Sequence, residues 1–72
     1  MTSKEWIELA ESYEKDAAEL EKNIERKEAF LNDKSNPLGA RVKAGQALAS
    51  LRMMRIDLLC TARAMRENAE RS

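Results

Sequence analysis

A single proline divides this 72-residue chain into two long stretches, and this break restricts the fold more than any other feature. Pro37 ends a cluster of turn-forming residues at positions 32–37, and no other proline occurs on either side. Proline is disfavoured inside a helix but common in its first turn. With Asn36 as the N-cap, a second helix is expected to begin at Pro37. The sequence therefore predicts one helix before the cluster and one after it.

The first stretch carries the pattern of a helix over residues 3–32. Thr2 and Glu5 have the spacing of a capping box, in which each side chain satisfies a backbone N–H of the first turn. Hydrophobic positions then recur at intervals of four and three, with Lys27 as the one charged member. This pattern is typical of a helix that packs along one side against another helix. Its apolar members are Trp6, Ala10, Tyr13, Ala17, Leu20, Ile24 and Leu31.

The second stretch repeats the spacing over a helix of about residues 37–70. Its series is Ala44, Leu48, Leu51, Arg55, Leu58, Ala62, Met65 and Ala69, and we call the two series together the heptad seam. Two seams of equal length joined by a short loop predict an all-α antiparallel hairpin, with residues 1–72 as one domain. A register that sets Leu31 against Ala44 also brings Arg55 close to an acidic flank of the first helix, formed by Glu14, Glu21 and Glu28.

Charge and composition agree with this pairing. Residues 1–36 hold ten acidic and six basic residues and residues 37–72 hold three and seven, so the halves carry −4 and +4. No apolar run approaches the roughly 20 residues of a membrane span, and the N-terminus lacks the apolar centre of a signal peptide. The single cysteine fits a reducing compartment. We expect a cytoplasmic protein that does not enter a membrane.

The sequence offers no set of residues for catalysis, a cofactor or a metal. It contains no histidine, and Cys60 lies mid-helix, away from the groups that would activate a thiol, so packing is the favoured interpretation. Acidic residues recur every three positions at Glu5, Glu8, Glu11 and Glu14, which is typical of a solvated face. A di-metal site of a helical bundle would also need histidine. The prediction is a non-enzyme without a cofactor.

The second helix carries more apolar surface than one partner helix can cover. We call this set the apolar stripe: Val42, Ala49, Met53, Ile56 and Cys60. At roughly 100° per residue it lies about half a turn from the seam. The stripe predicts a homo-oligomer, with a dimeric four-helix bundle as the leading form, and another protein's helix as a different occupant. Scattered surface residues are the alternative interpretation.

A set of arginines supports a second functional hypothesis. Eleven-residue spacings place five of them on one face, the arginine stripe: Arg41, Arg52, Arg55, Arg63 and Arg66. Such a stripe is a footprint of phosphate binding, but nearby acids and a pI near 6.3 favour ion pairing within the protein. The leading prediction is a small interaction or assembly module, and a nucleic-acid-binding accessory protein is the alternative. Very short, charged chains with two tandem helices are similar to small proteins of bacterial and phage genomes.

Overall fold

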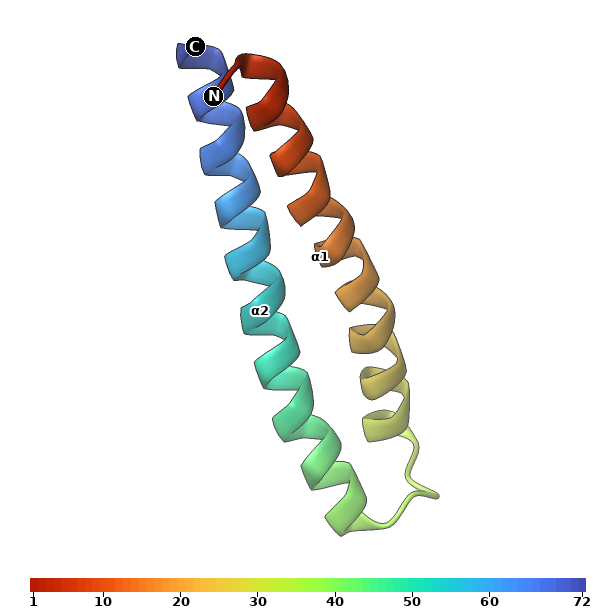
Figure 1. The fold of residues 1–72 in the computed structure, drawn as a ribbon. Coiled ribbons are helices and arrows are strands. Elements are labelled where there is room, and N and C mark those ends of the chain that lie inside the picture. The colour runs from red at the N-terminus through yellow and green to blue at the C-terminus, as the bar shows by residue number, and fades with distance from the viewer.

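The computed structural model describes residues 1–72 and contains two helices and no strand. Helix α1 spans Ser3–Asn32 and helix α2 spans Leu38–Arg71. The helices run antiparallel, with the loop at one end of the molecule and both termini at the other (Figure 1). The predicted helical hairpin is confirmed, and the predicted helix ends differ from the observed ones by one residue at most. The molecule measures 53 × 14 × 12 Å, so it is a rod two helices wide.

Helix α1 begins with the capping box that the sequence predicts. The Thr2 hydroxyl accepts a hydrogen bond from the Glu5 N–H at 3.2 Å, and the Glu5 carboxylate accepts one from the Thr2 N–H at 3.2 Å. Both donors belong to the first turn and have no partner within the helix. The hydrogen bonds from the Thr2 N–H and hydroxyl lower the pKa of the Glu5 carboxyl below its ordinary value.

Polar groups of the loop and of the first turn of α2 satisfy the last carbonyls of α1. The Asn36 amide donates to the Phe30 carbonyl at 3.0 Å, and the Arg41 guanidinium donates to the Leu31 carbonyl at 2.9 Å. Asp33 accepts hydrogen bonds from the hydroxyl and the backbone N–H of Ser35, and these bonds lower the pKa of the Asp33 carboxyl. The turn is therefore fixed by side chains from both of its ends.

The start of α2 differs from the sequence-based expectation. Pro37 is the N-cap, with φ −57° and ψ 143°, and Leu38 is the first helical residue. Asn36 makes no capping hydrogen bond to α2, and its side-chain NH2 group instead donates to the Phe30 carbonyl at the end of α1. Proline has no side-chain acceptor, so α2 starts without a side-chain cap. Asn36, the residue predicted to cap the second helix, thus makes its hydrogen bond to the C-terminal end of the first helix.

The core lies between the helices and is built mainly from small side chains. Seven residues are buried, five of them alanines, and no large side chain is completely enclosed. Alanine at the contact lets the two backbones approach closely, but it contributes little apolar area. The buried residues are Ala10, Ala17, Ile24, Ala44, Leu48, Ala62 and Ala69.

Specific contacts set the register at the two ends of the rod. Near the loop, a Cβ built on Gly45 would lie 3.8 Å from Cδ1 of Leu31, one residue beyond the expected partner, Ala44. Near the termini, the Ser3 hydroxyl donates to the Ala69 carbonyl at 2.8 Å.

In neither helix does an apolar stretch reach the length needed to cross a membrane.

Candidate functional site

The heptad seam lies along the interface of α1 and α2. Every member of both series is buried or half-buried, apart from Lys27, which is exposed. Arg55 is the one charged member that the interface partly encloses, with 37% of its side chain exposed. The seam residues are therefore occupied in holding the hairpin together, so a binding surface has to be sought on the remaining faces of the two helices.

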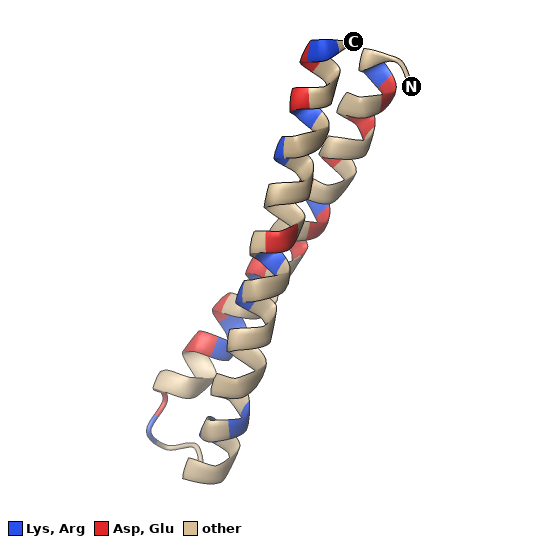
Figure 2. Ribbon diagram, turned by 90° about the vertical axis from the view of Figure 1, so that its left-hand side faces the viewer, with Lys and Arg blue, Asp and Glu red and all other residues tan.

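One long edge of the hairpin carries cross-helix ion pairs, and we call this edge the Glu–Arg flank. It is formed by the three glutamates that recur at heptad intervals on α1 and by arginines of α2. Figure 2 shows charged segments of both signs on both helices. The pairs are Glu14–Arg66 at 2.7 Å, Glu21–Arg55 at 3.0 Å and Glu28–Arg52 at 2.8 Å.

The Glu14–Arg66 pair has the best geometry of the three. Nε and Nη2 of Arg66 donate to the two carboxylate oxygens of Glu14, at 2.8 and 2.7 Å. Such a two-pronged contact fixes the orientation of both groups. The hydrogen bonds from Arg66 lower the pKa of the Glu14 carboxyl and raise the pKa of the Arg66 guanidinium.

The central pair, Glu21–Arg55, is less well aligned. Its charged atoms lie 3.0 Å apart, yet Oε2 of Glu21 and Nε of Arg55 are buried and make no hydrogen bond. Their attraction is therefore electrostatic, without the directional part of a hydrogen bond. A buried polar atom without a partner carries a desolvation cost. This is the weakest point of the flank.

The other two arginines of the arginine stripe are also engaged. Arg41 donates to the Leu31 carbonyl, and Arg63 lies 3.5 Å from Glu67 on the same helix, with 84% of its side chain exposed. A phosphate group would have to compete with carboxylates for four of the five guanidinium groups. Phosphate binding by this stripe stays a prediction.

The apolar stripe lies on the face of α2 that is turned away from α1. Val42, Met53 and Ile56 are 51%, 60% and 48% exposed, and Ala49 and Cys60 are exposed as well. Leu38, at 71%, extends the stripe by one turn toward the loop. The sequence interpretation omitted it, although its spacing of four residues from Val42 places it on the same face.

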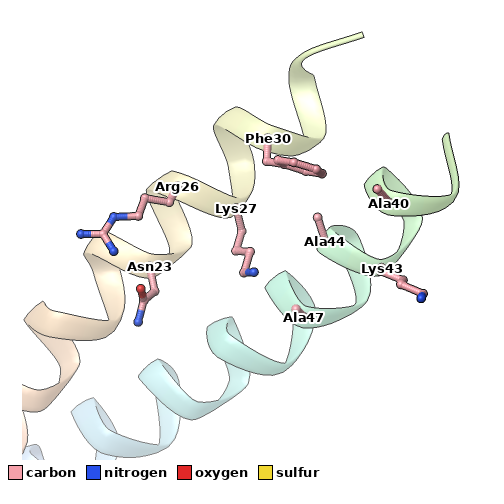
Figure 3. A pocket seen from close by; sticks show the side chains of 8 residues that line it. All are labelled: Asn23, Arg26, Lys27, Phe30, Ala40, Lys43, Ala44 and Ala47. Atoms are coloured by element: carbon pink, nitrogen blue, oxygen red, sulfur yellow. The ribbon is translucent and has the colours of Figure 1, made fainter. Parts of the chain in front are cut away.

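A groove opens on the edge of the hairpin opposite the Glu–Arg flank, near the loop. It holds about 640 Å³, and its lining includes Phe30, Ala40 and Lys43. Figure 3 shows the Phe30 ring reaching from α1 toward α2, with Lys27 below it and Arg26 pointing outward. These cations make no ion pair within the chain. The sequence interpretation missed the groove, because it arises where alanines of α2 leave space beside Phe30.

The fold and its surfaces define a class: an antiparallel helical hairpin with one ion-paired flank and an exposed apolar stripe on α2. No group of three or more acidic or cysteine side chains is arranged to hold a metal ion. No family model, curated protein sequence or solved structure matches the chain.

Proposed function

We propose that this chain is a small, non-catalytic assembly module that self-associates through the apolar stripe into a dimer of four helices. The observation that carries the proposal is the exposure of Val42, Met53 and Ile56 on one face of α2, at 51%, 60% and 48%. Contiguous apolar surface bounded by polar residues is typical of an interaction site. Covering this face would remove apolar area from water without disturbing the contact between α1 and α2.

The total surface of the hairpin supports the same proposal. The chain exposes 5277 Å², whereas a compact monomer of 8.2 kDa exposes about 4,500 Å². The excess is roughly 800 Å², which is comparable with the area that each partner contributes to a stable interface. A dimer would bring the exposed area per chain close to that of an ordinary small domain.

The composition of the core points the same way. Five of the seven buried residues are alanines, so the seam buries little apolar area. At this chain length a single core rarely supplies more than about 3–5 kcal/mol of stability. The chain has one cysteine and no histidine, so neither an internal disulfide nor an ordinary zinc site can add to it. Burial against a partner subunit is the remaining source of stability.

Two neighbouring methionines of α2 provide a matched test. Met53 belongs to the apolar stripe, and Met54 lies about 100° around the helix, with 60% and 51% of each residue exposed. Met53→Glu should lower the weight-average mass measured by sedimentation equilibrium toward that of the monomer. Met54→Glu should leave the mass unchanged. Circular dichroism should report the same helicity for both variants.

The outcomes separate the candidate functions. Equal masses for both variants and for the wild type would contradict the proposal. A monomeric wild type that binds a duplex oligonucleotide in fluorescence anisotropy, with affinity that falls steeply as salt rises, would support the nucleic-acid alternative instead. A monomeric wild type without such binding would contradict self-association. The apolar stripe would then be available to a helix of another protein.

A further inference from the structure

We infer that the second copy docks antiparallel, with α2 against α2, so that the loop end of each hairpin lies beside the termini of the other. This inference rests on the proposed self-association and adds the orientation of the partner. The stripe lies on the outer face of α2, so the two α2 helices would occupy the centre of the assembly and the two α1 helices its outside. The evidence is the spacing, the size and the charge of residues on that face.

The outer face of α2 carries a second 4,3 repeat. The series is Val42, Gln46, Ala49, Met53, Ile56 and Cys60, and all six residues are exposed. A repeat of this kind is typical of a helix that packs against another helix. It occupies the face opposite the heptad seam, so it is free for a partner that the chain itself does not supply.

The repeat is self-complementary when two copies pair antiparallel about a two-fold axis that crosses the outer face of α2 at the level of Leu51. Val42 then lies opposite the partner's Cys60, and Ala49 lies opposite the partner's Met53. A small side chain meets a larger one at the centre, as close packing requires. The same residue pairs occur twice, as an isologous interface demands. A parallel arrangement would instead place Ala49 against the partner's Ala49 and leave a gap.

Charged residues beside the repeat favour the same orientation. Lys43 and Asp57 flank it on one side, both are exposed, and neither makes an ion pair within the chain. The antiparallel arrangement brings Lys43 next to the partner's Asp57, and the two-fold axis repeats this pair. The parallel arrangement places Lys43 and the partner's Asp57 on opposite sides of the interface, so this pair cannot form.

The charge of the whole rod agrees with these local pairs. Division of the hairpin at its midpoint gives a loop half of residues 19–55, with eight basic and five acidic residues, which is +3. The half that bears the termini, residues 1–18 and 56–72, has five basic and eight acidic residues, which is −3. Antiparallel docking places each half against the oppositely charged half of the other copy, whereas parallel docking places like charges together.

Disulfide trapping tests the orientation directly. In the antiparallel dimer, Val42→Cys places a thiol next to the partner's Cys60, so mild oxidation should convert most of the variant to a covalent dimer on a non-reducing gel. The wild type should stay uncrosslinked, because its two Cys60 residues would lie about 27 Å apart along the axis, at 1.5 Å per residue. A disulfide requires Cα atoms within about 7 Å. The matched control V42C/C60S should also stay uncrosslinked.

A charge-reversal series gives an independent readout. Asp57→Lys sets like charges against Lys43 at both ends of the interface, and should weaken dimerisation on the order of tenfold. K43D/D57K restores opposite charges and should recover the wild-type dissociation constant. Raising the salt concentration should reduce the difference between the variants.

The outcomes separate the orientation from the self-association on which it rests. Efficient crosslinking of the wild type through Cys60, in a protein that is dimeric in solution, would overturn the antiparallel orientation and leave the proposed function intact. So would a double variant K43D/D57K no tighter than D57K. A monomeric wild type would overturn both.

Discussion

The guanidinium of Arg66 donates two hydrogen bonds to the carboxylate of Glu14, a residue 52 positions earlier in the chain, at 2.8 and 2.7 Å. The pair joins the first half of α1 to the end of α2. The side chains of Arg66 and Glu14 are 46% and 38% exposed, so solvent and salt weaken the attraction. Its main effect is on geometry, because a two-pronged contact aligns the helices in one register.

Replacing Arg66 with lysine should lower the midpoint of thermal unfolding, because an ammonium group cannot form the paired contact with Glu14. The matched control is Arg63→Lys, since Arg63 contacts Glu67 of its own helix and is 84% exposed. R63K should leave the midpoint almost unchanged. Circular dichroism melts at one fixed protein concentration measure both variants. An equal decrease for the two variants would contradict the role of the Glu14 contact.

Stability should decrease in acid. Hydrogen bonds from Arg66 lower the folded-state pKa of Glu14 from its ordinary 4.5. A depressed folded-state pKa contributes stability above the unfolded value, and this contribution is lost as the pH falls through the folded value. The unfolding midpoint should therefore fall as the pH drops below 4.5, and Glu14→Gln should flatten that dependence. Glu8→Gln, at an exposed residue without an ion pair, is the control, and an identical flattening would argue against the assignment.

Truncation of the two largest buried side chains should be strongly destabilising. Ile24 and Leu48 are each only 3% exposed, so Ile24→Ala and Leu48→Ala should each cost about 2–4 kcal/mol. Met54→Ala, at a residue 51% exposed and outside the apolar stripe, should have a much smaller effect on unfolding. Urea titrations followed by circular dichroism provide the comparison. Equal losses at Met54 and Leu48 would contradict the placement of the core.

Arg55→Leu should stabilise the hairpin by about 1 kcal/mol. Arg55 occupies a seam position, and its Nε is buried without a hydrogen-bond partner. Leucine would keep the apolar contact of the stem and remove the unsatisfied nitrogen. Removal of the guanidinium would also let the buried Oε2 of Glu21 reach water, since the rest of that side chain is already 42% exposed. A rise in the urea midpoint is the expected result. A fall would show that the Glu21 attraction outweighs the desolvation cost.

The two helices and the turn between them could be predicted because local sequence signals determine them. The capping box of Thr2 and Glu5, the turn-forming cluster before Pro37 and the two 4,3 series specify the helices by short-range chemistry. The cap of α2 could not be predicted, because Asn36 has two possible partners. Its amide is engaged with the Phe30 carbonyl, a contact that depends on the path of the loop.

The candidate site was less accessible to sequence reasoning. The acidic flank near Arg55 could be predicted from the register of the helices. Side-chain geometry decides which pairs are well aligned: Arg66 forms hydrogen bonds with Glu14, whereas Arg55 forms none with Glu21. The groove beside Phe30 depends on where small residues of the other helix fall. Dimerisation of the stripe stays a prediction, because one chain does not determine its own partner.

The molar mass of the wild-type protein in solution tests the central claim most directly. Light scattering coupled to size exclusion, over a tenfold range of concentration, should give twice the chain mass of 8.2 kDa, which is 16.4 kDa. That result would mean that the outer face of α2 is covered by a second copy. A mass of 8.2 kDa at every concentration would contradict self-association.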